Sequence, residues 1–373
     1  MYASSFMKKS FAKNKIFYDI AQDIRDYPNA WLYMVIGGRN TGKTYSALKY
    51  HIDHGEVPVF IKRRNNDVRI LSAGNHLGDK ERPYSIDLSP YKSINRDMGL
   101  NIKAFKIDDG LGAFYDCDED GPKGSPVAYL LSLSAVYKYK GFDLSECTSI
   151  IFDEFIPQPG ERTSSEEGEQ LLALYKTVAR AREVLGKPSL KLICLSNAEN
   201  VFNHTCDILE LTDQLAEMNT KHQETFYDSE REIFVRMLKT SDEIMEAEKK
   251  SGIYKAMQGT RWASMSFDNE FAFNDFSCVQ HVNLKGYKCL YELCYRHKSI
   301  YIYVNEESGC YYMTTARGQA QEVFDLEREI DQRRFYVEAG MMLRNACIDG
   351  RMLFKKYSYY DLLMNFKQRF NIK

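Results

Sequence analysis

Gly37-Gly38-Arg39-Asn40-Thr41-Gly42-Lys43-Thr44 is the stretch that decides the fold. It matches G-x-x-x-x-G-K-T, the pattern of a loop whose backbone N–H groups cradle phosphates. Residues 31–36 precede it as an apolar run of strand length, and residues 45–51 have the composition of a helix start. A strand, a glycine-rich loop and a helix start are the context that this pattern requires. The stretch therefore predicts nucleotide binding rather than a chance glycine-rich turn.

Each position of this loop has its own physical role. Gly37 and Gly42 allow backbone conformations that side chains forbid. The loop N–H groups and the helix N-terminus together form an anion site. Lys43 is expected to reach the β and γ phosphates of ATP, and Thr44 to place its hydroxyl on Mg²⁺. The predicted ATP-binding positions of the loop are Gly37, Gly38, Arg39, Asn40, Thr41, Gly42, Lys43 and Thr44.

Length and composition limit the class of protein. A chain of 373 residues with 44% hydrophobic residues predicts two domains, with three as the alternative, each with a real core. The net charge of -2 means that nucleic-acid binding would have to come from local basic patches. No stretch is long and apolar enough to span a bilayer, and the first residues lack the apolar core of a signal peptide. No membrane partner is therefore expected. Nine scattered cysteines favour reduced thiols in a cytosol.

A second motif lies at residues 149–154, Ser-Ile-Ile-Phe-Asp-Glu. An apolar strand that ends in Asp-Glu is typical of a Walker B motif. Asp153 would hold Mg²⁺ directly or through water, and Glu154 would polarise the attacking water. The pattern alone is common, but its place about a hundred residues after a phosphate-binding loop makes it strong. A glutamate here predicts ATP hydrolysis and a sheet with an additional strand between the two motifs.

Two further positions are candidates. Asn197 follows the apolar strand 190–195, where a polar side chain can sense the γ-phosphate or orient the water; a plain turn residue is the alternative. Residues 166–185 have helical periodicity and contain Arg180, with Arg182 close behind it. For Arg180, an ion pair on a helix surface is the commoner fate.

The composition changes after residue 265. We expect an ATPase domain of α/β class with a mostly parallel sheet over 1–239, a helical linker over 240–265 and an α+β domain over 266–373. Three aromatic strands are predicted at 288–295, 299–304 and 310–316, followed by helical stretches at 319–347 and 358–371. The C-terminal stretch mixes basic and aromatic residues, which suits phosphate binding with stacking, although a solvated surface is an equal competitor.

This set of motifs resembles the DNA-packaging (encapsidation) ATPase of small short-tailed phages with protein-primed genomes, relatives of the large terminase subunit. The resemblance covers both domains, and its matching stretches are residues 36–45, 149–156, 177–183, 193–198 and 265–271. The first two are shared by many ATPases, so the other three make it specific.

The resemblance implies a homomeric ring, usually of five subunits, at the portal vertex of an empty prohead in the host cytoplasm. Such a ring pumps double-stranded DNA with ATP and Mg²⁺, and a structural packaging RNA is an open further partner. The family's trans-acting arginine matches Arg180. A lysine that acts between subunits matches Lys140. The catalytic set expected from motifs and resemblance together is Glu154, Arg180, Lys140 and Asn197.

The second domain of the family resembles an RNase H-like nuclease. Nuclease activity needs clustered carboxylates that hold two metals, and the first strand here carries only Glu292. We therefore expect a nuclease relic that binds DNA or RNA without cutting. The alternatives are a nuclease-competent terminase, or an ATPase or helicase unrelated to packaging.

Overall fold

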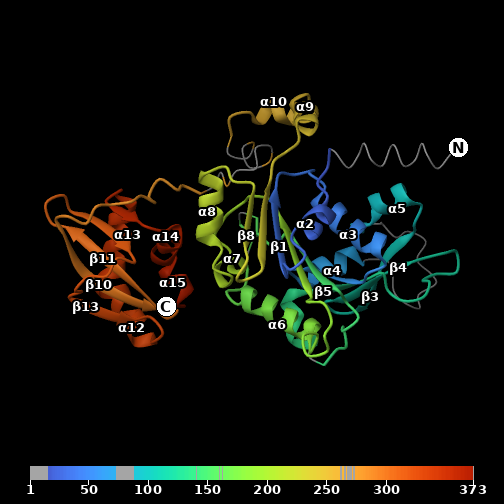
Figure 1. Ribbon diagram of the computed structural model, residues 1–373, viewed down its shortest axis with the longest axis horizontal. Helices are drawn as coiled ribbons and strands as arrows, with labels where there is room; N and C mark the ends of the chain where they lie inside the picture. The colour runs from blue at the N-terminus through green and yellow to red at the C-terminus, as the bar shows by residue number, and fades with distance from the viewer. Residues whose placement is uncertain are drawn as a thin grey trace. The chain divides into compact units, whose positions relative to one another are not determined.

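The computed structural model describes residues 16–72, 88–139, 141–158, 160–161, 163–260, 263, 266, 271 and 274–372. The chain divides into two compact units, each with its own sheet (Figure 1). Unit 1 comprises Met1–Leu209 and Lys221–Phe273, and unit 2 comprises Glu210–Thr220 and Asn274–Lys373. The domain boundaries expected from the sequence, at residues 239 and 266, remain predictions. By contact, 210–220 groups with unit 2 and the expected linker groups with unit 1.

Unit 1 contains a nine-stranded sheet in the order β3-β4-β5-β2-β6-β7-β1-β9-β8. The run from β5 to β9 is parallel, and β3, β4 and β8 pair antiparallel at the two ends. The strands are β1 (Leu32–Gly37), β2 (Pro58–Lys62), β3 (Ile102–Asp108), β4 (Leu111–Asp116), β5 (Ala128–Ser132), β6 (Ser149–Asp153), β7 (Lys191–Ser196), β8 (Thr225–Asp228) and β9 (Ile233–Leu238). The α/β class with a mostly parallel sheet is confirmed.

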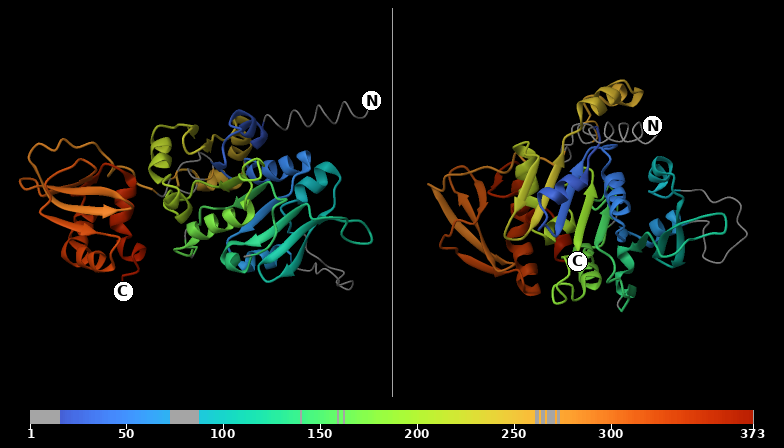
Figure 2. Two further views of the ribbon diagram at one scale, coloured as in Figure 1. Left: turned by 60° about the horizontal axis from the view of Figure 1, so that its bottom comes forward. Right: turned by 45° about the vertical axis from the view of Figure 1, so that its right-hand side comes forward.

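The additional strand is also confirmed. β7 pairs with β1 on one side and with β6 on the other, so it separates the phosphate-loop strand from the Asp-Glu strand. The crossover from β1 to β2 moves along the sheet in the opposite direction from the crossover between β6 and β7. Because parallel crossovers are right-handed, their helices α3 (Lys43–His54) and α6 (Glu167–Ala179) cover opposite faces (Figure 2).

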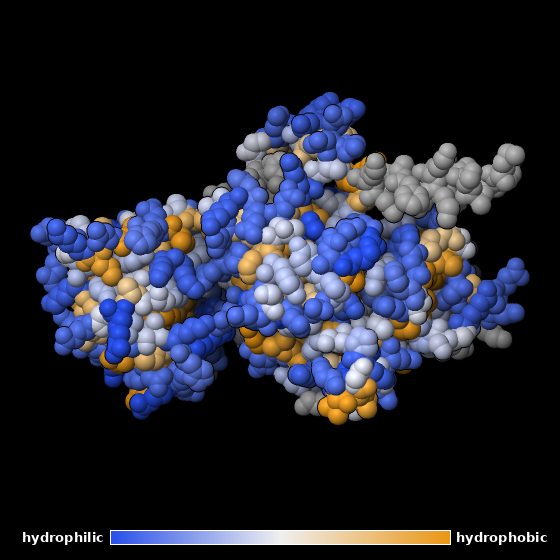
Figure 3. All heavy atoms as spheres, viewed as in Figure 1, coloured by the Kyte–Doolittle hydropathy of each residue, from blue (hydrophilic) through white to orange (hydrophobic). Residues whose placement is uncertain are grey.

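The remaining helices of unit 1 are short. They are α2 (Ile20–Asp26), α4 (Asn65–Leu71), α5 (Lys92–Met98), α7 (His204–Ile208), α9 (Asp242–Lys249), α10 (Gly252–Met257) and the 3₁₀ helix η1 (Leu133–Tyr139). Helices α2 and α3 contribute Ile20 and Ala47 to an apolar cluster in the core of unit 1. The strands β2 and β7 contribute Phe60 and Ile193 to the same cluster. The face drawn in Figure 3 is mostly hydrophilic, with hydrophobic side chains in small patches.

Residues 66–125 are polar and rich in Gly, Asp and Asn, which predicts an irregular insertion with small strands. The described part of this stretch is more ordered than that prediction. Its described residues include α4 and α5, and strands β3 and β4 extend the main sheet through β5. The apolar run at residues 129–136 is in strand β5 only as far as Ser132, because the chain turns into η1 there.

Unit 2 contains a five-stranded sheet in the order β13-β10-β11-β12-β14. Its strands are β10 (Tyr287–Tyr295), β11 (Lys298–Asn305), β12 (Cys310–Thr314), β13 (Glu322–Asp325) and β14 (Met352–Phe354). Its helices are α8 (Thr212–Thr220), α12 (Glu329–Phe335), α13 (Met341–Ile348), α14 (Tyr357–Met364), α15 (Phe366–Arg369) and the π-helical turn η3 (Tyr336–Gly340). The α+β class and the three aromatic strands are confirmed.

Two details of unit 2 correct the sequence prediction. Residues 322–325 form a strand where a helix was expected, because Phe324 is fully buried beside β10. Residues 352–354 form an edge strand that the sequence did not reveal.

Among the described helices of both units, none combines the length and the apolarity that crossing a membrane requires.

Candidate nucleotide site

Strand β1 delivers the glycine-rich loop to the N-terminus of α3. All six residues of β1 are buried, so the strand is a fixed base for the loop. Gly42 has φ 88°, a left-handed conformation that favours glycine. A Cβ on Gly38 would lie 2.7 Å from the backbone oxygen of Ser266, so this position also requires glycine. The two glycines therefore fix the path of the loop.

Lys43 lies folded against the loop that precedes it. Its Nζ donates to the carbonyl oxygens of Gly37, at 3.0 Å, and Gly38, at 2.7 Å. The side chain is buried, and this burial lowers the pKa of Lys43 to about 8, although the charge of Asp153 opposes the shift. A buried ammonium whose partners are neutral carbonyls is poised to gain from an anionic ligand.

The hydroxyl of Thr44 meets the end of β6. Thr44 Oγ1 donates a hydrogen bond of 2.8 Å to Oδ1 of Asp153. A hydroxyl and a carboxylate oxygen are the hard ligands that Mg²⁺ prefers. The two motifs expected from the sequence thus meet in the fold, with one candidate metal ligand from each.

Lys62, the last residue of β2, pairs with the two carboxylates at the end of β6. Lys62 Nζ lies 3.0 Å from Asp153 Oδ2 and 3.4 Å from Glu154 Oε2. Burial alone would lower the pKa of Lys62, but the charges of Asp153 and Glu154 outweigh it and raise the pKa. The Lys62 ammonium therefore stays charged and holds both carboxylates.

Glu154 lies at a strained turn that a buried arginine supports. Its φ is 61° and its side chain is 59% exposed, so the carboxylate lies at the surface of the site. Arg63 donates to the carbonyl oxygens of Glu154, at 3.0 Å, and Phe155, at 2.9 Å. The same guanidinium bonds the buried carboxylate of Glu167 at 2.6 Å. Arg63 thus fixes the backbone from which Glu154 projects.

Asn197 and two loop residues link the site to neighbouring segments. Asn197 Oδ1 accepts from Lys43 Nζ at 3.4 Å, which brings the tip of β7 to the loop. Arg39 lies 3.8 Å from the buried Glu199, and Asn40 donates to Glu248 of α9 at 3.2 Å. Burial raises the pKa of Glu199, with Arg39 opposing the shift. The predicted loop positions and Asn197 therefore form one cluster with Asp153.

The two arginines after α6 have different surroundings. Arg180 is the C-cap residue with φ 47°; its guanidinium donates to the carbonyl oxygens of Phe142 and Gly141 and is 41% exposed. Arg182 is buried and donates to the carbonyl oxygens of Ser145 and Cys147. Arg180 is thus accessible, whereas Arg182 ties the loop to the segment before β6. Lys140 and most of the stretch 265–271 lie outside the described residues.

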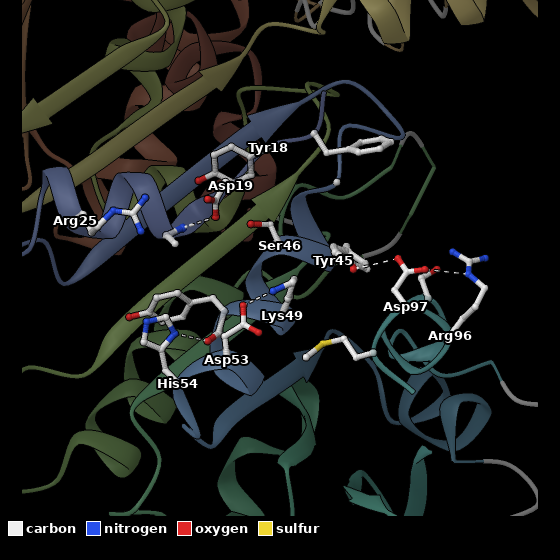
Figure 4. Close-up of a pocket in the computed structure, with 16 residues that line it drawn as sticks. Tyr18, Asp19, Arg25, Tyr45, Ser46, Lys49, Asp53, His54, Arg96 and Asp97 are labelled. Carbon is white, nitrogen blue, oxygen red and sulfur yellow. Dashed lines mark hydrogen bonds and ion pairs between the residues drawn. The ribbon is translucent and has the colours of Figure 1, made fainter. Parts of the chain in front are cut away.

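A cavity of about 930 Å³ opens beside the loop (Figure 4). Gly42, Phe17 and Tyr18 lie at one part of its wall, and the outward face of α3 continues it through Tyr45. The carboxylate of Asp97 in α5 accepts from the Tyr45 hydroxyl at 3.2 Å. The cavity therefore adjoins the phosphate loop and offers aromatic surfaces.

In unit 2, Glu292 lies on β10, which is flanked by β11 and β13. Its carboxylate accepts a hydrogen bond of 3.1 Å from the Tyr301 hydroxyl. No group of three or more His, Cys, Asp or Glu side chains that could hold a metal occurs among the described residues.

The sequence predicts a strand over residues 57–62 that ends at Arg63 and Arg64, and neither Lys62 nor Arg63 is predicted from it as a site residue. A signal was present, because charged residues at the carboxyl end of one parallel strand lie beside those of its neighbours. β2 pairs directly with β6. The position of β2 beside β6 in the sheet has to be known before Lys62 can be linked to Asp153.

Comparison with known proteins agrees with this architecture. A family model described as Podovirus DNA encapsidation protein (Gp16) matches residues 123–334, more than half of the chain. The DNA packaging protein of Bacillus phage B103 is 26% identical over 293 residues, which are 76% of this chain and 77% of that protein. A chain of the bacteriophage Phi-29 viral genome packaging motor assembly has TM-score 0.62 and 19% identity, covering 95% of this chain and 99% of that one.

The Phi-28 gp11 DNA packaging motor gives TM-score 0.57 and 16% identity, covering 96% of this chain and 98% of that one. At these identities the two structures show a shared fold. The family model adds membership, since it spans strands of both units. The chain therefore belongs to the podovirus DNA encapsidation protein (Gp16) family, and its function is the packaging of phage DNA.

Proposed function

We propose that the chain is the subunit of a motor that hydrolyses ATP to move double-stranded DNA into a prohead. The hydrogen bond between Thr44 and Asp153 is the observation that supports this function most directly. It joins the phosphate loop to the strand that carries Glu154, with Lys43 and Asn197 in the same cluster. Phosphoryl transfer depends on positioning and charge rather than on covalent chemistry, and this cluster supplies both.

The residues present fit Mg-ATP. Bound Mg²⁺ neutralises and polarises the phosphates of ATP. Thr44 and Asp153 would hold the metal, because their oxygens already lie at hydrogen-bond distance from each other. The N-terminus of α3 and the Lys43 ammonium would bind the phosphates. Asn197 would orient the γ-phosphate or the attacking water from the tip of β7.

Glu154 is the general base in this scheme. Its exposed carboxylate can accept a proton from water, and Arg63 keeps its backbone in the left-handed turn that directs it outward. Lys62 Nζ lies 3.4 Å from the Glu154 carboxylate and helps to position it.

The cavity beside Gly42 is the candidate site for the adenine. Phe17 and Tyr18 contribute aromatic surface there, and the backbone N–H of Tyr18 donates to Thr41 O at 3.0 Å. This hydrogen bond couples the segment before α2 to the phosphate loop. Packing in the wall of the cavity is the competing role for both rings.

Arg180 is the candidate for action on a neighbouring subunit's ATP. An arginine supplied in this way stabilises transition-state charge and contributes on the order of 10³ to 10⁵ in rate. The guanidinium is partly exposed, and its partners are main-chain carbonyls and the exposed Asp143 at 3.9 Å, so it is able to exchange contacts. Lys140 is proposed in a similar role, on the family resemblance alone. A homomeric ring, with five subunits as the family resemblance implies, would bring these residues to each site.

We further propose that unit 2 binds nucleic acid, either DNA or a structural RNA, as a nuclease relic. Glu292 on β10 has a tyrosine hydroxyl as its partner rather than a second carboxylate. The motor would work in the host cytoplasm at the portal vertex of the prohead.

ATP turnover by the purified chain, measured with and without proheads and DNA, tests this function. We expect basal hydrolysis that rises when both are added, together with protection of the DNA from nuclease digestion. DNA packaging without ATP consumption would contradict the proposal.

A further inference from the structure

The chain passes between the two units three times. The crossings lie after Leu209, after Thr220 and after residue 273. Two domains in tandem need only the last of these. The first two exist because α8, with the residues just before it, leaves unit 1 and returns to it.

Polar contacts hold α8 in unit 2. Asp213 Oδ1 accepts from the backbone N–H of Ser358, and Oδ2 accepts from the Ser358 hydroxyl, both at 2.8 Å. Ser358 lies in the first turn of α14, whose own N-cap residue makes no side-chain capping bond. Asp213 therefore supplies the cap that the sequence of α14 lacks, and its charge also suits a helix N-terminus.

Two lysines add to this attachment. Lys298 of β11 donates to both carboxylate oxygens of Glu210, at 2.7 and 2.8 Å. Lys356 lies 3.6 Å from Asp213. Burial, with the charge of Asp213 second, raises the pKa of Tyr359 to about 12. The segment 210–220 is thus attached to β11 and to α14 at separate points.

Both ends of α8 join unit 1 through short connectors. Helix α7 ends at Ile208, and strand β8 begins at Thr225. Arg231 fixes the first connector by donating to Leu209 O at 2.8 Å. β8 pairs with β9, and β9 pairs with β1, the strand that leads into the phosphate loop. Connectors of so few residues have little slack in which to absorb a displacement.

We propose that α8 is a coupling element, which carries displacements of the β1–β9–β8 part of the ATPase sheet to unit 2. Asp213 and Glu210 are its positioning residues, because they fasten α8 to unit 2. This role rests on the ATPase function proposed above. Helix α8 would thus couple the ATPase sheet to unit 2, although none of the nucleotide-site residues described above lies in it.

Three changes in the full-length chain test this role. Asp213→Ala removes the cap, and Glu210→Lys places a lysine against Lys298. The double variant Glu210→Lys/Lys298→Glu restores an ion pair of opposite polarity. Glu306→Lys is the matched control, since Glu306 forms an exposed pair with Lys288 in the same unit without α8. Each protein is assayed for basal ATP turnover, for DNA packaged per ATP hydrolysed with proheads, and for thermal unfolding.

We expect Asp213→Ala and Glu210→Lys to keep basal turnover. DNA packaged per ATP should fall, because one lost helix cap weakens the equilibrium between attached and released α8 roughly fivefold. The double variant should recover the yield, and Glu306→Lys should match the unmodified chain.

An unchanged yield per ATP in both single variants would overturn the coupling role, as would a double variant that folds but does not recover. If Asp213→Ala unfolds, the charge-exchange pair still decides the question. Absence of ATP turnover in the unmodified chain would instead refute the proposed function, so the two failures are distinguishable.

Discussion

Thr44 and Asp153 are 109 positions apart in sequence and are joined by a hydrogen bond of 2.8 Å between Oγ1 and Oδ1. Each end of this bond belongs to a different motif, and the sheet order brings the two motifs together. A hydroxyl that already faces a carboxylate needs little reorganisation to share a metal ion with it.

Thr44→Val should therefore weaken Mg²⁺-dependent ATP binding, whereas Thr44→Ser should largely preserve it. Valine keeps the shape of threonine and removes only the oxygen. A loss of about 2 kcal/mol, or roughly thirtyfold in Kd, is the scale of one charged hydrogen bond. Titration with a fluorescent ATP analogue, with Mg²⁺ and with EDTA, measures it. Equal affinity of the valine and serine variants would remove Thr44 from the metal site.

ATP affinity should depend on pH through Lys43. Its pKa is about 8 without a bound anion, and bound phosphates favour the charged form and raise that pKa. Affinity should thus be constant below pH 8 and fall above it, by up to about tenfold per pH unit, with proton uptake on binding. Calorimetry of the slowly hydrolysing Glu154→Gln variant in buffers of different ionisation heat measures both effects. Lys43→Arg, whose charge persists throughout this range, should show no such slope.

Arg63 should matter for stability as well as for the site. It is buried with Glu167, and it bonds two main-chain carbonyls next to Glu154. Arg63→Met leaves a buried carboxylate without its partner, a change that costs about 3–5 kcal/mol. Arg64→Ala is the control, because Arg64 is 51% exposed. Urea unfolding of both variants should separate them clearly, and equal midpoints would refute the structural role of Arg63.

The sequence predicted the strands of unit 1 well where a motif or an apolar run marked them. The position of β7 between β6 and β1 followed from the Asp-Glu motif and is confirmed. Residues 322–325 and 352–354 were not recognised as strands, because runs of three or four residues carry too little periodicity to distinguish strand from helix.

The site could be predicted only in part for a related reason. Residues within a motif, such as Lys43 and Asp153, are identified by their neighbours in sequence. Lys62, Arg63 and Asp213 act through contacts that span 91 to 145 positions in the sequence, so no local pattern identifies them. The association of Glu210–Thr220 with unit 2 likewise depends on Asp213 and Ser358, which are 145 positions apart.

Nucleic-acid binding by the chain should weaken steeply as salt rises, without cleavage of the DNA. Each phosphate contact by Lys or Arg releases counterions, so several contacts give a large slope. Supercoiled plasmid should stay intact with Mg²⁺ or Mn²⁺, because Glu292 has Tyr301 as its partner. Nicking that disappears in Glu292→Ala would identify an active nuclease and favour a cutting terminase.

Mixed rings should reveal whether Arg180 acts across a subunit boundary. Arg180→Ala should keep ATP binding and lose turnover, since the guanidinium contributes only to the transition state. Glu154→Gln should likewise bind ATP and hydrolyse it about 10² to 10⁴ times more slowly. Each variant alone should therefore turn over ATP far more slowly than the unmodified chain. In a mixture, an Arg180→Ala subunit keeps Glu154 and can receive Arg180 from a Glu154→Gln neighbour, so part of the activity should return.

Arg182→Ala serves as the comparison, because that buried side chain ties down its own loop and its loss should lower the melting temperature instead. Intact assembly with no recovery in the mixture would place Arg180 in its own subunit's chemistry.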